Sequence, residues 1–162
     1  METRERNRIE VDAMQATVIW RQEHFINGRF VAGEGEVLEV ENPATEEIIA
    51  KLAQVSSAQV DGAVMAARRA FESGCWQDAE FRSQVIGRMA DLLEQRRDEF
   101  TAALVTEAGT PVSISRFLQV QAPIDILRDL AQRTLVNRDR HLGVDERVPR
   151  SESVIHYVPV GV

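Results

Sequence analysis

The feature that most constrains this chain is a change in the spacing of its apolar residues near Ser56. Before Ser56, short β-prone runs are separated by turn dipeptides, a pattern typical of short strands. From Ser56 to about Leu135, apolar residues recur at spacings of three and four, which is the period of a helix. After Asn137 the β-prone pattern returns. We therefore expect short strands, then helices, then strands again.

Two turn signals divide the first strand region. Asn27-Gly28 lies between apolar residues, and this pair favours the positive φ values of a tight hairpin turn. The segment 42–45, Asn-Pro-Ala-Thr, also predicts a turn, since the residue before proline is displaced from the helical region. The runs 36–40 and 47–55 are typical of strands. We expect ordered structure from about Trp20 and a small antiparallel meander.

The first helix has both of its ends marked in the sequence. Ser56 and Gln59 have the spacing of a capping box, and Gly74 is a C-terminal stop signal. The apolar stripe of this helix consists of Val60, Val64, Ala67 and Phe71.

Two longer helices are expected after Gly74. One runs from about Phe81 to about Val105 and is stopped by Gly109 and Pro111. Its apolar stripe, opposite the charged segment 96–99, is Val85, Met89, Leu92, Leu93, Phe100 and Leu104. The other runs from about Ser115 to Leu135, with Pro123 expected to kink or break it. Its stripe is Phe117, Val120, Ile124, Leu127 and Ala131.

The last segment is polar and then apolar. Residues 137–150 carry Gly143 and Pro149 and predict a loop or a loose strand, whereas 153–158 is β-prone. Residues 159–162 end inside an apolar run, so we expect the chain to be the front portion of a larger protein.

Composition excludes several classes of function. The 162 residues carry 26 acidic and 19 basic side chains, a net charge of −7, and form no basic face for nucleic acid. No apolar run approaches the roughly 18 residues that cross a membrane, and residues 1–10 lack a secretory pattern. The single Cys75 allows no internal disulfide, which agrees with a cytoplasmic location.

Candidate reactive residues are few. Cys75 follows a helix end, where the dipole opposes thiolate formation, so we interpret it as a small, partly buried hydrophobic residue. His24, His141 and His156 lack the spacing of a zinc site. His156 alternates with apolar neighbours in the expected last strand and is interpreted as a surface or interface residue.

Two further motifs were weighed as ligand sites. Gly33-Glu34-Gly35 lacks the third glycine of a dinucleotide loop, because Leu38 stands there, and is interpreted as a surface turn. The lone carboxylate of Glu107 could bind a cation or cap the chain, but a solvated turn residue is favoured. We assign no catalytic, cofactor-binding or metal-ligating residue.

Six segments, in order from Phe25 to Val162, resemble the N-terminal region of the aldehyde dehydrogenase superfamily. Residues 25–30 resemble its opening Ile-Asn-Gly strand, and 42–47 its Asn-Pro-Ala-Thr-Gly-Glu turn, with Glu46 where glycine is usual. Residues 60–71 resemble the family's first helix, which runs on to a Gly-x-Trp ending, here at 74–76. The second expected helix resembles the family's next helix at Arg82, Ala90, Asp91, Leu92, Leu93, Glu94, Arg96 and Glu99. The last two matches are a turn at 107–111, with departures at Ala108 and Thr110, and a strand at 157–162.

This resemblance implies an α/β fold and places the chain in the N-terminal part of the aldehyde dehydrogenase fold. That fold has a Rossmann-like NAD(P) domain, a catalytic domain and a β-strand oligomerisation arm. Residues 1–19 would be a disordered lead-in. Residues 20–136 would supply the outer hairpin and helices of the NAD(P)-binding domain, and 137–162 the oligomerisation arm and first strand toward the cofactor.

The resemblance also implies a reaction. The family oxidises aldehydes to carboxylic acids through a cysteine thiohemiacetal, hydride transfer to NAD or NADP, and a glutamate-activated water. Its cysteine, glutamate, asparagine and lysine would all lie beyond Val162, and Cys75 does not match the nucleophile. Some members hold a structural monovalent cation near the position of Glu107.

Three hypotheses follow. The first is an N-terminal fragment of an NAD(P)-dependent aldehyde dehydrogenase that is inactive alone, binds no cofactor by itself, and self-associates or joins the remainder of the enzyme. The second is a non-catalytic interaction module that pairs with itself or with a longer dehydrogenase subunit. The third, a helical enzyme of another family, rests only on Cys75, the histidines and Glu107.

Overall fold

The computed structural model describes residues 18–147 and 149–161. Of the expected lead-in at residues 1–19, only residues 18 and 19 are among the described residues. Val162 also lies outside the described residues. None of the helices in the described ranges is long and apolar enough to cross a bilayer.

The first hairpin forms as its turn dipeptide predicts. Strands β1 (Glu23–Ile26) and β2 (Arg29–Ala32) pair antiparallel. The turn residues Asn27 and Gly28 have φ values of 51° and 78°, and positive φ at both positions matches the twist of the flanking strands.

The second hairpin consists of β3 (Val37–Glu41) and β4 (Ile48–Ala53). The side-chain oxygen of Asn42 accepts a hydrogen bond from the amide of Ala44 at 2.9 Å and holds the expected turn. Glu46 has a φ of 60°, in the left-handed region. This conformation explains why glycine suits the position and shows that Glu46 carries some backbone strain.

The expected continuous meander is wrong, because β2 and β3 do not pair. Gly33 crosses so close to β4 that a Cβ there would lie 2.1 Å from the Ala53 carbonyl oxygen. The amide of Gly35 then donates to the carbonyl of Gln54 at 2.8 Å, so the chain turns before β3 begins. The two hairpins are linked by the His24 ring, whose Nε2 lies 2.7 Å from the Ala53 carbonyl oxygen.

Helix α2 (Ser57–Glu72) begins and ends as predicted. The amide of Gln59 donates to the Ser56 hydroxyl at 3.3 Å, and the Ser56 amide donates to the Gln59 side chain at 3.0 Å. Gly74, with a φ of 83°, redirects the chain into the short 3₁₀ helix η1 (Cys75–Gln77).

The expected helix 81–105 is instead two helices, α3 (Ala79–Gln95) and α4 (Arg97–Ala108). The break is at Arg96, whose φ of −106° and ψ of 21° leave the helical region. Helix α3 packs mainly on α6, whereas α4 packs on the π-helical segment η2 (Ser115–Gln121). The two helices pack against different partners. We therefore attribute the break at Arg96 to tertiary packing, since the sequence has no local stop signal there.

The expected third helix is one helical run with an irregular centre. It comprises α5 (Val112–Ile114), η2 and α6 (Ala122–Arg133). The amide of Ala122 donates to the carbonyl of Phe117, a π-helical bond, immediately before Pro123. Proline has no amide proton and its ring crowds the preceding turn, so a wider turn accommodates it. The kink or break expected at Pro123 is thus a π-helical irregularity within a continuous helical run, and the helix is not broken there.

The core lies where α3 and α4 meet η2 and α6. Ala90, Val120 and Ile124 are buried together, with Leu93, Phe100, Leu104 and Leu127 packed around them. The predicted stripe of the second helix is thus confirmed in part. Met89 and Leu92 are 50% and 41% exposed, so they do not belong to this core.

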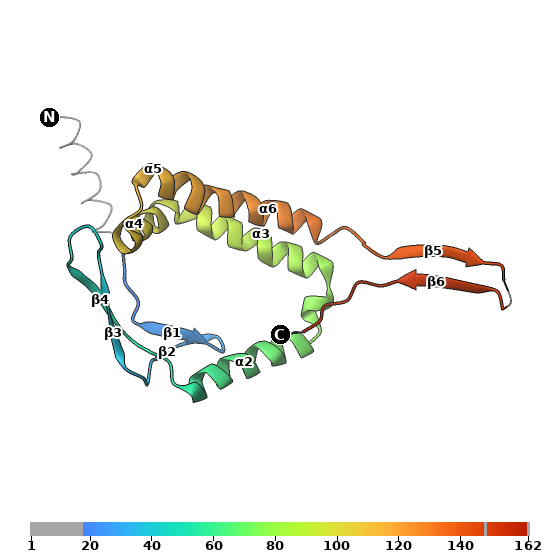
Figure 1. Ribbon diagram of the computed structural model, residues 1–162, viewed down its shortest axis with the longest axis horizontal. Helices are drawn as coiled ribbons and strands as arrows, with labels where there is room; N and C mark the ends of the chain where they lie inside the picture. Colours follow the sequence, from blue (N-terminus) through green and yellow to red (C-terminus); the bar gives the residue numbers. More distant parts are fainter. Residues whose placement is uncertain (1–17, 148, 162) are drawn as a thin grey trace.

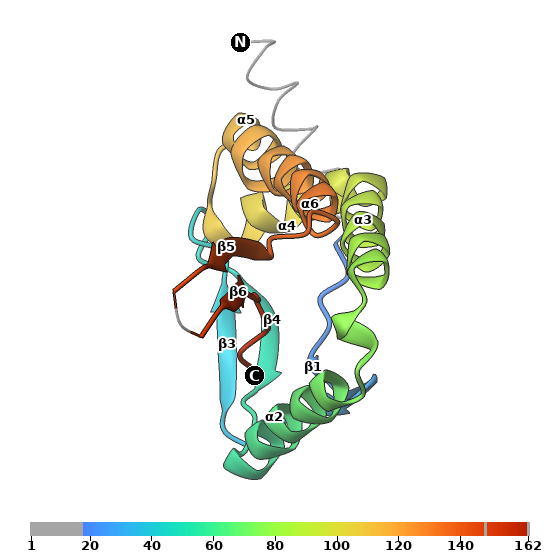
Figure 2. The ribbon, with the colours of Figure 1, turned by 90° about the vertical axis from the view of Figure 1, so that its right-hand side faces the viewer.

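Much of the remaining apolar surface is uncovered. The accessible surface is 12392 Å², whereas a compact monomer of 18.2 kDa exposes roughly 8,100 Å². Figures 1 and 2 show α2 on the opposite side of the strands from the layer of α3, α4 and α6. Helix α2 buries none of its residues fully. Its exposed apolar side chains include Val60, Val64 and Met65.

The last two strands form a projecting hairpin, which we call the arm. Strands β5 (Arg140–Asp145) and β6 (Ser151–Ile155) pair antiparallel and extend away from the helices (Figure 1). Of the expected loop or loose strand at 137–150, residues 140–145 form a strand and the other described residues lie in connecting segments. The expected last strand begins two residues earlier than predicted and ends at Ile155, so residues 156–161 have no regular structure.

Replacing Ile124 with alanine should lower the free energy of unfolding by about 2–5 kcal/mol, since its side chain is fully buried and a cavity would remain. Urea denaturation of the 162-residue chain measures this change. The matched control is Ile126→Ala, which removes the same atoms from a side chain that is 57% exposed on the same helix. It should change the free energy of unfolding by less than about 0.5 kcal/mol; equal losses in both variants would contradict this assignment of the core.

Candidate functional site

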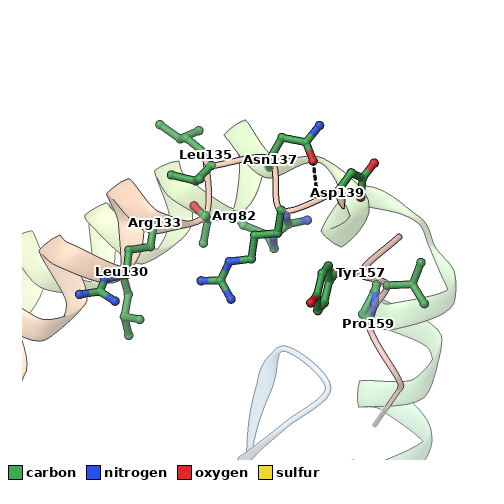
Figure 3. Close-up of a pocket in the computed structure, with 13 residues that line it drawn as sticks. Arg82, Leu130, Arg133, Leu135, Asn137, Asp139, Tyr157 and Pro159 are labelled. Carbon is green, nitrogen blue, oxygen red and sulfur yellow. Dashed lines mark hydrogen bonds between the residues drawn. The ribbon is translucent and has the colours of Figure 1, made fainter. Parts of the chain in front are cut away.

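A hollow lies at the base of the arm. It has a volume of about 560 Å³ and is enclosed by the start of α3, the end of α6, and the two chain segments that enter and leave the arm (Figure 3). Its lining is mostly apolar with a few cations and comprises Ala79, Arg82, Leu130, Arg133, Thr134, Leu135, Val136, Asn137, Arg138, Asp139, Tyr157, Val158 and Pro159.

Three charged groups of this hollow are already bonded within the protein. Arg82 donates to the carbonyls of Trp76 at 2.6 Å and Gln77 at 2.9 Å. Arg133 pairs with Asp129 at 2.6 Å, and Asp139 lies 2.9 Å from a ring nitrogen of His156. None of the lining side chains is a thiol or a serine. The hollow is therefore suited to packing against apolar chain and offers no thiol for covalent attack on an aldehyde.

Cys75 is exposed, so the expectation of a partly buried residue is wrong, although its place after the end of α2 is confirmed. Its sulfur lies 3.2 Å from the hydroxyl of Ser73. Within the described ranges, no histidine or carboxylate forms a hydrogen bond with it. A thiol without a base beside it is not set up for nucleophilic attack.

The three histidines form no common cluster, since His24 lies in the first hairpin whereas His141 and His156 lie on the arm. His24 is in β1, His141 is in β5, and His156 follows β6, one residue beyond the strand in which it was expected. His156 is exposed, as expected for a surface or interface residue, and His141 is exposed as well. No group of three or more His, Cys, Asp and Glu residues in the described part of the chain is close enough to hold a metal ion.

The glycine motif forms the expected turn. The Ser56 hydroxyl donates to the Glu34 carboxylate at 2.7 Å, which ties this turn to the cap of α2. The space beside Gly33 is filled by the backbone of Ala53 and not left open for a ligand. Residues 33–35 therefore do not fit a nucleotide phosphate.

Glu107 is exposed near the end of α4, next to the left-handed Gly109. A Cβ at Gly109 would lie 2.8 Å from the ring of Pro43, so this turn packs against the second hairpin. The contact gives the 107–111 segment a structural role.

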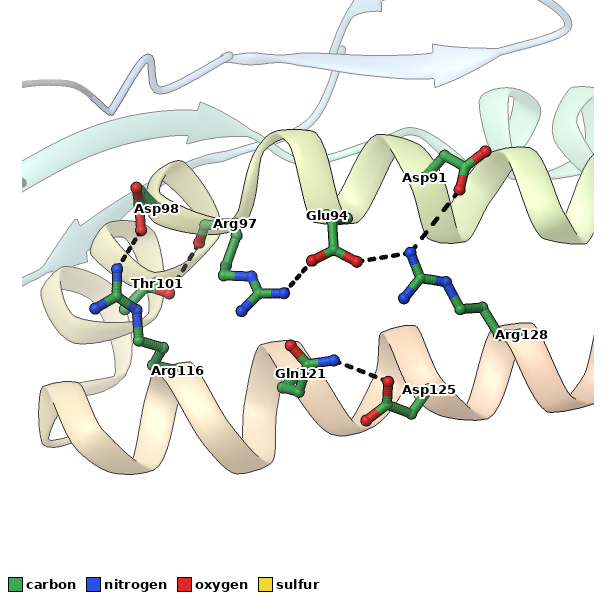
Figure 4. A network of polar contacts seen from close by, with 9 residues as sticks. All are labelled: Asp91, Glu94, Arg97, Asp98, Thr101, Arg116, Gln121, Asp125 and Arg128. Carbon is green, nitrogen blue, oxygen red and sulfur yellow. Dashed lines mark hydrogen bonds and ion pairs between the residues drawn. The ribbon is translucent and has the colours of Figure 1, made fainter.

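Sequence reasoning missed a network of ion pairs that joins the helices around the core (Figure 4). Glu94 accepts hydrogen bonds from Arg97 and from Arg128, the latter at 2.6 Å, and so bridges α3 to α6. Asp98 pairs with Arg116 at 2.6 Å and bridges α4 to η2. The i,i+3 spacing of Glu94 and Arg97 could have predicted their ion pair from the sequence. The partners on later helices, Arg128 and Arg116, could not be predicted in this way.

These pairs change the titration of the carboxylates. The hydrogen bond from Arg128 is the main reason that the pKa of Glu94 lies below its ordinary value of 4.5, and the charge of Arg97 adds to the effect. The hydrogen bond from Arg96 likewise lowers the pKa of Glu99. A carboxylate with a lowered pKa in the folded state stabilises the fold above its ordinary pKa and loses that contribution as the pH falls through the lowered value.

In the Glu94→Gln variant, the side chain at position 94 no longer titrates. The free energy of unfolding should therefore fall less steeply below about pH 4.5 than in the wild type, because the wild type loses the contribution of the ionised Glu94 in acid. The free energy of unfolding is measured by urea denaturation from pH 7 to pH 3. Glu107→Gln, at an exposed glutamate, is the matched control and should leave the slope with pH unchanged. The same slope in wild type and Glu94→Gln would show that this bridge does not stabilise the fold.

Known proteins resemble the chain in sequence and in fold. The model of the aldehyde dehydrogenase family matches residues 30–162. "Aldehyde dehydrogenase 1" of Tanacetum cinerariifolium is 40% identical over 98 residues, which are 59% of this chain and 20% of that protein. A mitochondrial aldehyde dehydrogenase of Leishmania tarentolae is 39% identical over 104 residues, covering 64% of this chain and 21% of that protein.

Among solved structures, an NAD-dependent benzaldehyde dehydrogenase from Corynebacterium glutamicum has a TM-score of 0.72 and 29% identity, over 80% of this chain and 28% of that one. The chain thus spans about a fifth of the length of the curated relatives it matches. The hairpins, the helices and the mixed α/β character fit the N-terminal part of that fold. By sequence and by fold, the chain belongs to the aldehyde dehydrogenase family.

Proposed function

We propose that this chain is the N-terminal scaffold of an NAD(P)-dependent enzyme that oxidises aldehydes to carboxylic acids, and that the chain does not catalyse this reaction alone. The match of the family model to residues 30–162 supports the first part. The second part is supported by the exposed Cys75, the only thiol, which has no hydrogen-bonded base among the described residues. Covalent aldehyde oxidation requires both groups.

The cofactor belongs to the whole enzyme in this proposal. A nicotinamide dinucleotide accepts hydride in this family, and the benzaldehyde dehydrogenase is named as NAD-dependent. The glycine motif at 33–35 does not fit a dinucleotide phosphate, since the Ala53 backbone fills the space beside Gly33 and Glu34 would repel a phosphate. We therefore assign this chain no step of hydride transfer.

The proposal gives each segment a place. Residues 20–136 would supply the outer hairpins and helices of the cofactor-binding domain. Residues 137–162 would supply an assembly arm and then a segment, without regular structure over 156–161 here, that leads toward the cofactor in the whole enzyme. The exposed apolar residues of α2, including Val60 and Val64, would then be covered by the rest of that domain. We also propose a cytoplasmic location, consistent with the lone cysteine.

A second function is favoured by the arm itself. Leu142, Val144 and Ile155 are exposed on a two-stranded sheet with both edges open. Open edges accept further strands, so the chain could act as a non-catalytic module that pairs with itself or with a longer dehydrogenase subunit. Sedimentation velocity of the 162-residue chain, alone and with such a subunit, separates this function from that of a monomeric scaffold.

The main proposal is tested by mixing the purified chain with NAD or NADP and a panel of aliphatic and aromatic aldehydes. We expect no reduced nicotinamide to appear in the absorbance assay, because no described thiol has a base. Isothermal titration calorimetry should likewise detect no binding of either dinucleotide.

The control is Cys75→Ser, which removes the only thiol of the chain. Turnover by the wild-type chain that disappears in Cys75→Ser would overturn the proposal and make Cys75 a nucleophile. Turnover that persists in Cys75→Ser would indicate a contaminating enzyme, and the assay would be repeated on material purified in the presence of denaturant and refolded.

A further inference from the structure

The arm is a hairpin that receives little support from the rest of the protein. Figure 1 shows β5 and β6 extending beyond the helices, and all but one residue of each strand is exposed. The strand register shifts between His141 and Val144, and Gly143 has a φ of 86°, so the ladder is interrupted near its middle. An isolated two-stranded hairpin is only marginally stable in water, so small side-chain effects decide how often its strands are paired.

Two ion pairs cross the arm, and each contains a histidine. A ring nitrogen of His156 lies 2.9 Å from the carboxylate of Asp139, where the strands leave the helical layer. A ring nitrogen of His141 lies 3.8 Å from the carboxylate of Glu152. Between residues 139–145 and 151–156, these are the only side-chain polar links from one described strand to the other. The remaining pairs, Arg147 with Asp145 and Arg150 with Glu146, are confined to the tip.

From this placement we propose that pairing of the two arm strands is controlled by protons, with the histidine–carboxylate pairs of His141 and His156 as the switch. Imidazole is the side chain that normally changes charge between about pH 5 and 8. When both rings are protonated, each forms an ion pair with a carboxylate on the opposite strand and stabilises the hairpin. As the pH rises and the rings become neutral, both ion pairs are lost and the strands separate more often.

Other charges around the histidines modify this effect but do not replace it. The register pairs Arg140 with Ile155 and His141 with Val154, and Asp139 and His156 are the next residues beyond the first of these pairs. Each ring therefore has one carboxylate across the arm, while the two rings repel each other when both are charged. Further cations line the same hollow as Asp139 or lie in β5; these are Arg82, Arg133, Arg138 and Arg140.

The consequence for assembly rests on the proposed function of the arm. If the arm joins subunits, its strands are paired and available for association mainly near pH 5, the lower limit of this pH range. The pairing of the strands and the association of subunits are separate observables, so failure of one does not decide the other.

The test is hydrogen exchange of the full 162-residue chain, followed by NMR and expressed as protection factors, which remove the intrinsic pH dependence of exchange. Amides of β5 and β6 should be more protected at pH 5.5 than at pH 8 by about two- to thirty-fold, the range expected for two exposed ion pairs. The β3–β4 hairpin is an internal control. Its cross-strand pair, Lys51 with Glu39 at 2.6 Å, keeps both charges over this range, so its protection should not change.

The double substitution His141→Gln and His156→Gln should abolish the pH dependence in the arm, and His24→Gln, outside the arm, should leave it intact. If the arm of the double variant is unprotected at both pH values, the proposal is tested on the single variants His141→Gln and His156→Gln. The protection factors of each single variant should depend less on pH than those of the wild type. Equal protection of the wild-type arm at pH 5.5 and pH 8, or full pH dependence in the double variant, overturns the proposal.

Discussion

The structure depends on one contact, the packing of α3 and α4 against η2 and α6. Ile124 is fully buried there between Ala90 and Val120, and the ion pairs of Glu94 lie along the edge of the same interface. Ala90 is fully buried in this contact, and the π-helical segment that ends just before Pro123 contributes Val120 to the same cluster. The arm and the hairpins are attached to this helical layer.

Outside this layer, the protein is a set of half-covered elements. Helix α2, both N-terminal hairpins and the arm expose apolar side chains that a self-sufficient domain would bury. Membership in the aldehyde dehydrogenase family, combined with a length about a fifth of that of its relatives, gives these faces a physical explanation. They have the character of surfaces that pack on further chain, which is why a scaffold role is favoured over a separate chemistry.

Sequence predicted the features that neighbouring residues decide. The Asn27-Gly28 turn and the Ser56 cap follow from local backbone preferences and hydrogen bonds, and both are confirmed. The helix break at Arg96 and the unpaired β2 and β3 were predicted wrongly, because they depend on partners far away in sequence. The same reason hides the pairing of His141 with Glu152, which follows from a strand register that shifts near Gly143. For the candidate site, sequence correctly located the glycine turn but misjudged the burial of Cys75.

The central claim is that one small helical layer holds this chain together while the other elements rely on further contacts. Residue-resolved hydrogen exchange of the whole chain at one pH tests it most directly. We expect the slowest amides to lie around Ala90 in α3 and Ile124 in α6, with amides of α2 exchanging at least about tenfold faster. Equal protection of α2 and α6 would contradict it, because α2 would then belong to a self-sufficient fold.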